Sequence, residues 1–221
     1  MASIKNMLQT IMNETTDTMA MEIVKNVSNP IPPTPTPSPE NEKIKNKGTG
    51  AGGANTNKNG LSYESLTDLD DKLQVVESSQ YSTVIKFNVS DVILTRTKQS
   101  HLFKCMKNHI DTKVKKAHCC KNPDECYINE TTKTMFIIEK KFQQTAGSVC
   151  EKIQTPDFKI WQYSRTFPDY NIVYVYCLSD WFKDNCQAEL EYLEFKQIPI
   201  FWGASETYKD DIINFMVNYK V

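Results

Sequence analysis

Asp124, Glu139 and Lys141 are the residues of this chain whose types and spacing best suit chemistry. Asp124 precedes one short apolar run and Glu139 follows another, with polar residues suited to a turn between the two runs. If the hairpin closes between Thr131 and Thr132, Asp124 lies opposite Glu139, and their Cβ atoms are about 4.5–5.5 Å apart. Because side chains alternate along a strand, Lys141 shares the sheet face of Glu139.

Two carboxylates that share one small volume repel each other, and a divalent cation relieves that repulsion. Mg²⁺ prefers oxygen ligands and usually takes one or two protein carboxylates, which leaves positions for water and a substrate phosphate. We therefore predict that Asp124 and Glu139 hold Mg²⁺ and that Lys141 positions the water that attacks a phosphodiester bond. Lys140 points to the opposite face. The alternative from this motif alone is a surface hairpin with an ordinary Glu–Lys pair.

The order Pro-Asp, apolar strand, Glu-x-Lys resembles the signature of the PD-(D/E)XK nuclease superfamily. Two segments are similar to a group of small type II restriction endonucleases: the Gly- and Asn-rich stretch 48–64, and the catalytic strand with its following helix at 138–154. The resemblance covers residues 46–221. Cys150 departs from it, since an acidic residue is expected there.

The resemblance implies an α/β fold with a PD-(D/E)XK (restriction-endonuclease-like) core, a mixed β-sheet flanked by helices. It implies a type II site-specific deoxyribonuclease that uses Mg²⁺ to cut double-stranded DNA at a short site, as a homodimer with a cognate DNA methyltransferase. Glu64 would stand beside Asp124, Glu139 and Lys141 as the fourth catalytic residue. The DNA-binding residues would be Asn55, Asn57, Lys58 and Gln143. The alternatives are a structure-specific DNA repair or recombination nuclease of the same fold, and a non-catalytic DNA-binding module.

The residues of the Gly/Asn-rich segment leave its structure open. Glycines mixed with Asn and Thr from 48 to 60 are typical of a flexible linker, but they also let the backbone approach DNA closely. We favour the second interpretation because the segment precedes Glu64. Glu64 falls on a predicted helix from Leu61 to about Val76, with leucines at helical spacing. The alternative for Glu64 is an ordinary exposed helix carboxylate.

Composition allows a DNA-binding enzyme without proving one. The chain has 221 residues, 39% of them hydrophobic, which is enough for one α/β core plus a tail. The formal net charge is −1, but basic residues gather just before Asp124, where they either bind phosphates or form a solvated helix face. These residues are Arg96, Lys98, Lys104, Lys107, Lys113, Lys115, Lys116 and Lys121.

Cysteines and histidines gather between residues 105 and 126 and raise the question of a structural zinc. The residues are Cys105, His109, His118, Cys119, Cys120 and Cys126. Zinc is the weaker interpretation because no paired C-x₂-C spacing occurs. Seven cysteines, an odd number, and the lack of a recognisable secretory segment predict reduced thiols in an intracellular, soluble protein.

The N-terminal part differs from the rest of the chain. Prolines recur between residues 30 and 39, which predicts an extended, flexible tail over 1–45 and a single endonuclease domain over 46–221. Residues 3–26 have the pattern of a Met-rich amphipathic helix. No stretch approaches the roughly 20 apolar residues that a membrane-spanning helix needs, so no membrane partner is expected.

The sequence after the hairpin predicts alternating helices and strands. A helix from about 148 to 162 should begin with a capping box formed by Ser148 and Glu151. The later elements should be a buried strand at 171–178, a helix at 184–196, a strand at 198–202 and a helix at 208–219. A strand that follows a helical crossover pairs parallel, so the sheet should be mixed, with helices on both faces.

Overall fold

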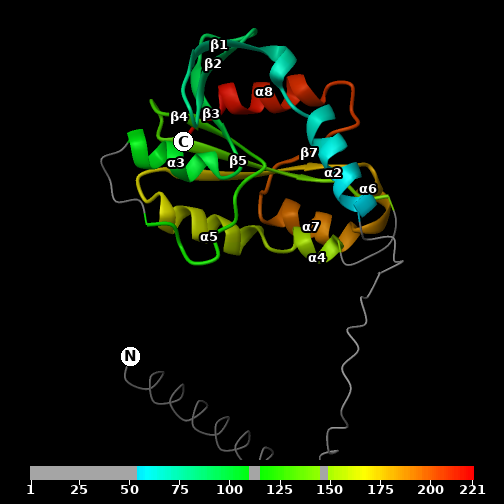
Figure 1. Ribbon diagram of the computed structural model, residues 1–221. Helices are drawn as coiled ribbons and strands as arrows, with labels where there is room; N and C mark the ends of the chain where they lie inside the picture. The colour runs from blue at the N-terminus through cyan, green and yellow to red at the C-terminus, as the bar shows by residue number, and fades with distance from the viewer. Residues whose placement is uncertain (1–53, 110–114, 145–148) are drawn as a thin grey trace, which may run out of the picture. The chain divides into compact units, whose positions relative to one another are not determined.

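A seven-stranded sheet organises the residues that the structure describes (Figure 1). This computed structural model describes residues 54–109, 115–144 and 149–221. The strands lie side by side in chain order: β1 (Leu73–Ser78), β2 (Thr83–Phe87), β3 (Ile93–Lys98), β4 (Glu125–Asn129), β5 (Thr134–Lys141), β6 (Asn171–Leu178) and β7 (Ile200–Trp202). Strands β1 to β5 pair antiparallel, whereas β5, β6 and β7 pair parallel. The predicted α/β fold with a mixed sheet is confirmed.

The hairpin of β4 and β5 has the predicted register. Glu125 pairs with Ile138, and Asn129 pairs with Thr134 at the turn. The Asn129 side-chain carbonyl accepts hydrogen bonds from the backbone N–H groups of Thr131 and Thr132, at 3.0 and 3.1 Å. This local bonding pattern closes the turn and thereby fixes which residues of the two strands face each other.

Helices cover both faces of the sheet, as predicted (Figure 1). One face packs against α3 (His101–His109), α4 (Val149–Ile153), α5 (Pro156–Thr166), α6 (Trp181–Asn185) and α7 (Gln187–Phe195). The other face packs against α2 (Ala54–Leu66) and α8 (Tyr208–Asn218). Each face therefore has its own apolar cluster, and β5 contributes alternate residues to both, such as Ile137 to the first and Ile138 to the second.

The predicted helix from Leu61 to Val76 is wrong beyond Leu66. After α2 the chain forms a short 3₁₀ helix η1 (Asp70–Lys72) and then strand β1. The Thr67 hydroxyl and N–H both donate to the Tyr63 carbonyl, at 2.7 and 3.0 Å, and close the last turn. The leucine spacing was misleading because Leu66 is exposed and Leu73 belongs to β1.

The predicted helix at 148–162 is two helices. Pro156 begins α5, and a proline disfavours helical geometry at the residue before it and cannot donate a backbone hydrogen bond. Ser148 and its predicted capping box lie outside the described residues. The strand at 171–178 is confirmed as β6, and the elements at 184–196, 198–202 and 208–219 correspond to α7, β7 and α8 with shifts of a few residues.

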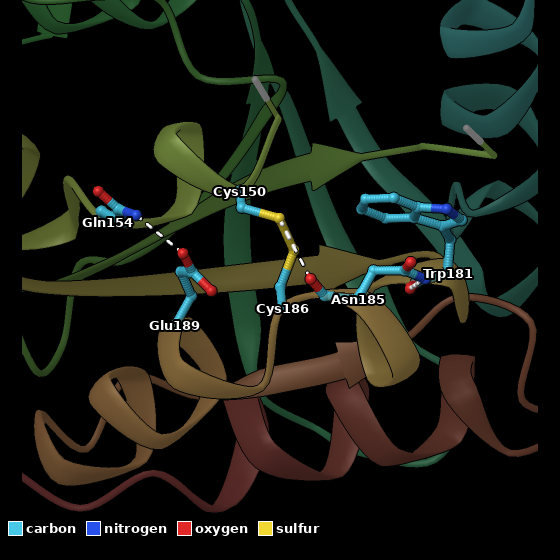
Figure 2. The surroundings of a disulfide bond; sticks show 6 residues. All are labelled: Cys150, Gln154, Trp181, Asn185, Cys186 and Glu189. Carbon is cyan, nitrogen blue, oxygen red and sulfur yellow. Dashed lines mark hydrogen bonds between the residues drawn. A yellow bond between two sulfur atoms is a disulfide. The ribbon is translucent and has the colours of Figure 1, made fainter. Parts of the chain in front are cut away.

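Cys150 and Cys186 form a disulfide, contrary to the expectation that all seven cysteines are reduced (Figure 2). Their Cα atoms are 5.9 Å apart, a usual separation for this bond. The disulfide joins α4 to the junction of α6 and α7, and beside it Gln154 donates a 2.9 Å hydrogen bond to Glu189. The other five cysteines are free thiols. A pairing of residues this far apart in the chain is invisible to sequence spacing.

Two predictions concern residues that the structure does not describe. The Pro-rich tail over 1–45, with its candidate helix at 3–26, and the glycines before Ala54 lie outside the described residues. Among the helices that are described, none combines the length and apolar character needed to cross a membrane.

Candidate functional site

Asp124 lies one residue before β4 and is anchored to the neighbouring strand. Its carboxylate Oδ2 accepts a 2.7 Å hydrogen bond from the backbone N–H of Lys140 in β5. Burial, and then the nearby negative charge of Glu139, raise the pKa of Asp124 from 3.8 to about 6. Asp124 is thus a carboxylate held where its negative charge is unfavourable.

Glu139 and Lys141 share one face of β5, as the alternation predicts. The Lys141 Nζ lies 2.5 Å from the Glu139 Oε1, and a second ammonium, Lys159 of α5, lies 3.1 Å from the same oxygen. Burial raises the pKa of Glu139, but the two ammonium groups together outweigh it and hold that pKa below its usual range. We call Asp124, Glu139, Lys141 and Lys159 the Glu139 cluster.

A buried tyrosine borders the Glu139 cluster. Tyr174 of β6 is 2% exposed, and burial followed by the charge of Glu139 raises its pKa. The interaction of its hydroxyl with the Glu139 carboxylate contributes to that rise, so Tyr174 is a polar group at the edge of the cluster.

The opposite face of β5 carries a second charged group, which we call the Glu125 cluster. Its members are Glu125, Lys140, Arg96 and Lys98. The buried Lys140 Nζ lies 3.2 Å from the Glu125 carboxylate and also donates to the Glu64 backbone carbonyl at 3.1 Å. Burial opposes the charge of Glu125, but Lys140 and then Arg96 keep its pKa below the usual value. Every member therefore has an oppositely charged neighbour.

Glu64 lies on α2 at the edge of a small hollow. The hollow has a volume of about 220 Å³ and is lined by Leu61, Glu64, Ser65, Asp68, Lys98, Gln99, Asp124, Glu125 and Lys140. The Glu64 charge contributes to the raised pKa of Asp124, after burial and Glu139. Glu139 and Lys141 do not line this hollow. Asp124 is therefore the residue whose pKa both Glu64 and Glu139 raise.

The approach of α2 to the sheet depends on Gly203, the residue after β7. A Cβ at this position would overlap the Tyr63 hydroxyl and crowd the Thr67 side chain, both on the sheet-facing side of the α2 segment. The missing side chain thus lets α2 lie close enough for Glu64 to reach the hollow.

The predicted DNA-binding residues fall in two places. Asn55, Asn57 and Lys58 belong to α2 and not to a loop, which corrects the predicted Gly/Asn-rich loop at these positions; their side chains lie outside the description. Gln143 follows β5, and its N–H and carbonyl both bond to the Ser179 hydroxyl at 3.1 Å. The structure thus places Gln143 near the end of β5 that carries Glu139 and Lys141.

The basic run before Asp124 is only partly available to a ligand. Arg96 is largely buried against Glu125 and Asp70, and Lys98 lies near the same carboxylates, so these two cations belong to the Glu125 cluster. Lys115, Lys116 and Lys121 are exposed. Lys113 lies outside the described residues.

The structure gives the zinc interpretation no support among the described side chains. Within 60–107, 115–144 and 150–221, the one group of three potential ligands with atoms within 4.8 Å of each other is Cys150, Cys186 and Glu189. The two sulfurs of that group are joined in the disulfide. By the same criterion, Asp124, Glu139 and Glu64 do not form a set of three. The carboxylate pair of Asp124 and Glu139 remains the candidate for a cation.

Sequence reasoning missed Lys159, Tyr174 and the Glu125 cluster. Lys159 and Tyr174 reach Glu139 only through the packing of α5 and β6, and no local pattern marks them. The Glu125 cluster had a usable signal, since strand alternation places Lys140 and Glu125 away from Glu139. No family model, curated protein or solved structure matches this chain.

Proposed function

We propose that this protein is a Mg²⁺-dependent DNA endonuclease with a PD-(D/E)XK core, which cuts double-stranded DNA at a short site in the manner of a type II restriction enzyme. The observation that carries the proposal is the pairing of Asp124 with Glu139 beside Lys141. The Asp124 pKa of about 6 supports it, because burial first and the Glu139 charge second make the negative charge of Asp124 unfavourable, and a bound divalent cation would offset both.

The donor set fits Mg²⁺. Asp124 and Glu139 offer two carboxylates, a number that this ion often accepts, and the Tyr174 hydroxyl is a further polar group beside Glu139. When bound there, Mg²⁺ would supply charge neutralisation at a phosphate and acidify a bound water. Asp124 and Glu139 would hold the ion.

The remaining groups have roles that follow from their contacts. Lys141 would hold the attacking water, which forms a new bond to phosphorus while one P–O ester bond breaks and the departing oxygen takes up a proton. Lys159 would keep Glu139 ionised and oriented through its 3.1 Å contact. Glu64 would act at a greater distance, through the charge of Asp124.

The topology also supports the proposal. An antiparallel hairpin that bears the acidic residues, followed by helices and a parallel strand, is the arrangement expected of this nuclease core. Here β4 and β5 form the hairpin, α4 and α5 the crossover, and β6 the parallel strand.

Digestion of unmethylated phage DNA with the purified full chain and Mg²⁺ tests the proposal. Discrete bands are expected for a restriction enzyme, and EDTA should abolish them. A smear would mean that the protein is a non-specific nuclease and not a site-specific one. Intact DNA under all conditions would overturn the proposal. A restriction role also implies a homodimer and a companion methyltransferase, and sedimentation with a short duplex tests the first of these.

A further inference from the structure

The outward face of α5 exposes two large aromatic rings. Phe158 and Trp161 are 58% and 52% exposed. Their rings stack on each other with centroids 5.7 Å apart and planes 23° from parallel. Adjoining exposed rings leave a sizeable apolar surface in water, which is a common mark of a binding site.

Cations surround these rings. The Arg165 guanidinium carbon lies 5.2 Å from the Trp161 ring centroid, one turn farther along α5. A hollow of about 650 Å³ adjoins them, and its lining consists of Lys115, Lys116, Ala117, His118, Phe158, Trp161, Gln162 and Arg165. No carboxylate is among the described residues that line it. We call Phe158, Trp161, Arg165, Lys115 and Lys116 the α5 patch.

The α5 patch and the Glu139 cluster share one helix but use different sides of it. Lys159, which contacts Glu139, is the residue after Phe158 and lies two residues before Trp161. Side chains one or two positions apart on a helix do not face each other, so the patch points away from Glu139 while Lys159 points toward it. The patch is therefore a separate surface beside the site, on the outward side of α5.

We propose that the α5 patch binds a nucleotide whose base is unstacked from its neighbours, in a single-stranded segment of DNA. Phe158 and Trp161 stack on the base, and Arg165 with the two lysines contacts the adjoining phosphates. The substrate class is thus DNA with a single-stranded segment or a base that leaves the helix. That this DNA is also the substrate for cleavage rests on the proposed function above.

The chemistry of the patch favours nucleic acid over an acidic protein segment. Carboxylates of a peptide need cations but gain nothing from two exposed rings stacked on each other. Nucleotides use both, because every base has an aromatic face and every linkage has a negative charge.

A binding experiment with the full chain carrying Glu139→Gln, in EDTA, separates binding from cleavage. The probes are a short labelled oligothymidylate and a fully paired duplex of the same length, followed by anisotropy and by quenching of tryptophan fluorescence. Phe158→Ala and Trp161→Ala should each weaken oligothymidylate binding by about 10-fold or more and leave duplex binding unchanged. The matched control is Phe195→Ala, which removes a phenylalanine that is 80% exposed on α7.

The outcomes distinguish this inference from the proposed function. Oligothymidylate binding that is equal in the parent, Phe158→Ala and Trp161→Ala overturns the α5 patch, even if the unsubstituted chain cuts DNA. Poly-glutamate that binds as tightly, with the same losses in the two variants, overturns it in favour of an acidic protein partner. Ring-dependent oligothymidylate binding by a chain that never cuts DNA supports the patch and overturns the nuclease instead.

Discussion

The two faces of β5 carry charged clusters built from similar residues, yet the clusters differ in balance. In the Glu125 cluster one buried carboxylate meets three cations, and its pKa is lowered. In the Glu139 cluster two carboxylates share two cations, and one of them, Asp124, has a raised pKa. With Asp68 and Asp70 included, every charged group of the first cluster has an ion-pair partner. In the second cluster the described residues give Asp124 no ion pair, so its negative charge stays unfavourable, which is the property that a cation site needs.

The substitution with the largest expected effect tests whether the Glu139 cluster serves catalysis. Glu139→Gln should reduce Mg²⁺-dependent cleavage by more than about 100-fold, since even outer partners of metal ligands change activity by about 10- to 100-fold. DNA binding measured in EDTA should stay or strengthen, because a negative charge is lost. The control is Glu130→Gln in the exposed turn of the same hairpin, which should cut normally. Wild-type cleavage by Glu139→Gln would remove Glu139 from the site.

The second prediction compares adjacent lysines. Lys141→Ala should lower the single-turnover cleavage rate by about 100-fold, as expected when a positioning group is lost. Its effect on the free energy of unfolding should be small, because removing it leaves Lys159 beside Glu139. Rapid-quench kinetics and urea denaturation together measure both quantities.

Lys140→Ala should show the reverse pattern. It leaves the buried Glu125 with one cation fewer and should cost about 3 kcal/mol of stability, the lower end for a broken buried pair because Arg96 remains. Lys86→Ala, which breaks an exposed strand ion pair, should cost no more than about 1 kcal/mol. Equal rate losses for Lys140→Ala and Lys141→Ala would mean that the two faces do not differ in function.

A smaller effect follows from the raised pKa of Asp124. Between pH 3.8 and about 6 the folded, metal-free protein binds more protons at Asp124 than the unfolded chain, so stability falls as pH rises through this window. The free energy of unfolding falls by up to about 3 kcal/mol over this window, and the loss persists above pH 6. In EDTA, Asp124→Asn should therefore be more stable than wild type at pH 8 and show no such gain at pH 3.5, as measured by urea denaturation. A gain that is the same at both pH values would contradict the pKa.

The smallest effect is expected from removing residues 1–45, which include none of the residues named in the two clusters. A chain that starts at Asn46 should keep its cleavage pattern and nearly its full thermal stability, because a Pro-rich segment contributes few buried contacts. Loss of activity or of dimer formation in this truncation would show that the single-domain interpretation is wrong.

The residues of the site that lie on one hairpin could be predicted from the sequence. Strand alternation and the polar turn were enough to place Asp124 by Glu139 and to separate Lys140 from Lys141. The β6 strand could be predicted equally well, since an apolar run rich in β-branched and aromatic residues indicates a buried strand. By contrast, Lys159, Tyr174 and the disulfide depend on how α5, β6 and α4 pack, and sequence spacing contains no record of that packing. The helix error at Leu73 arose because apolar residues from two successive elements, the end of α2 with its following turn and strand β1, repeat by chance at helical spacing.

Gly203 is far from the charged clusters in the sequence, yet it contacts the segment that carries Glu64. Its lack of a side chain sets the separation between α2 and the sheet. A larger residue would meet the end of the Tyr63 ring and the Thr67 side chain, so either these two side chains or helix α2 would have to move. A displacement of α2 would carry Glu64 with it, while Asp124, Glu139 and Lys141 are held by the sheet and would stay in register.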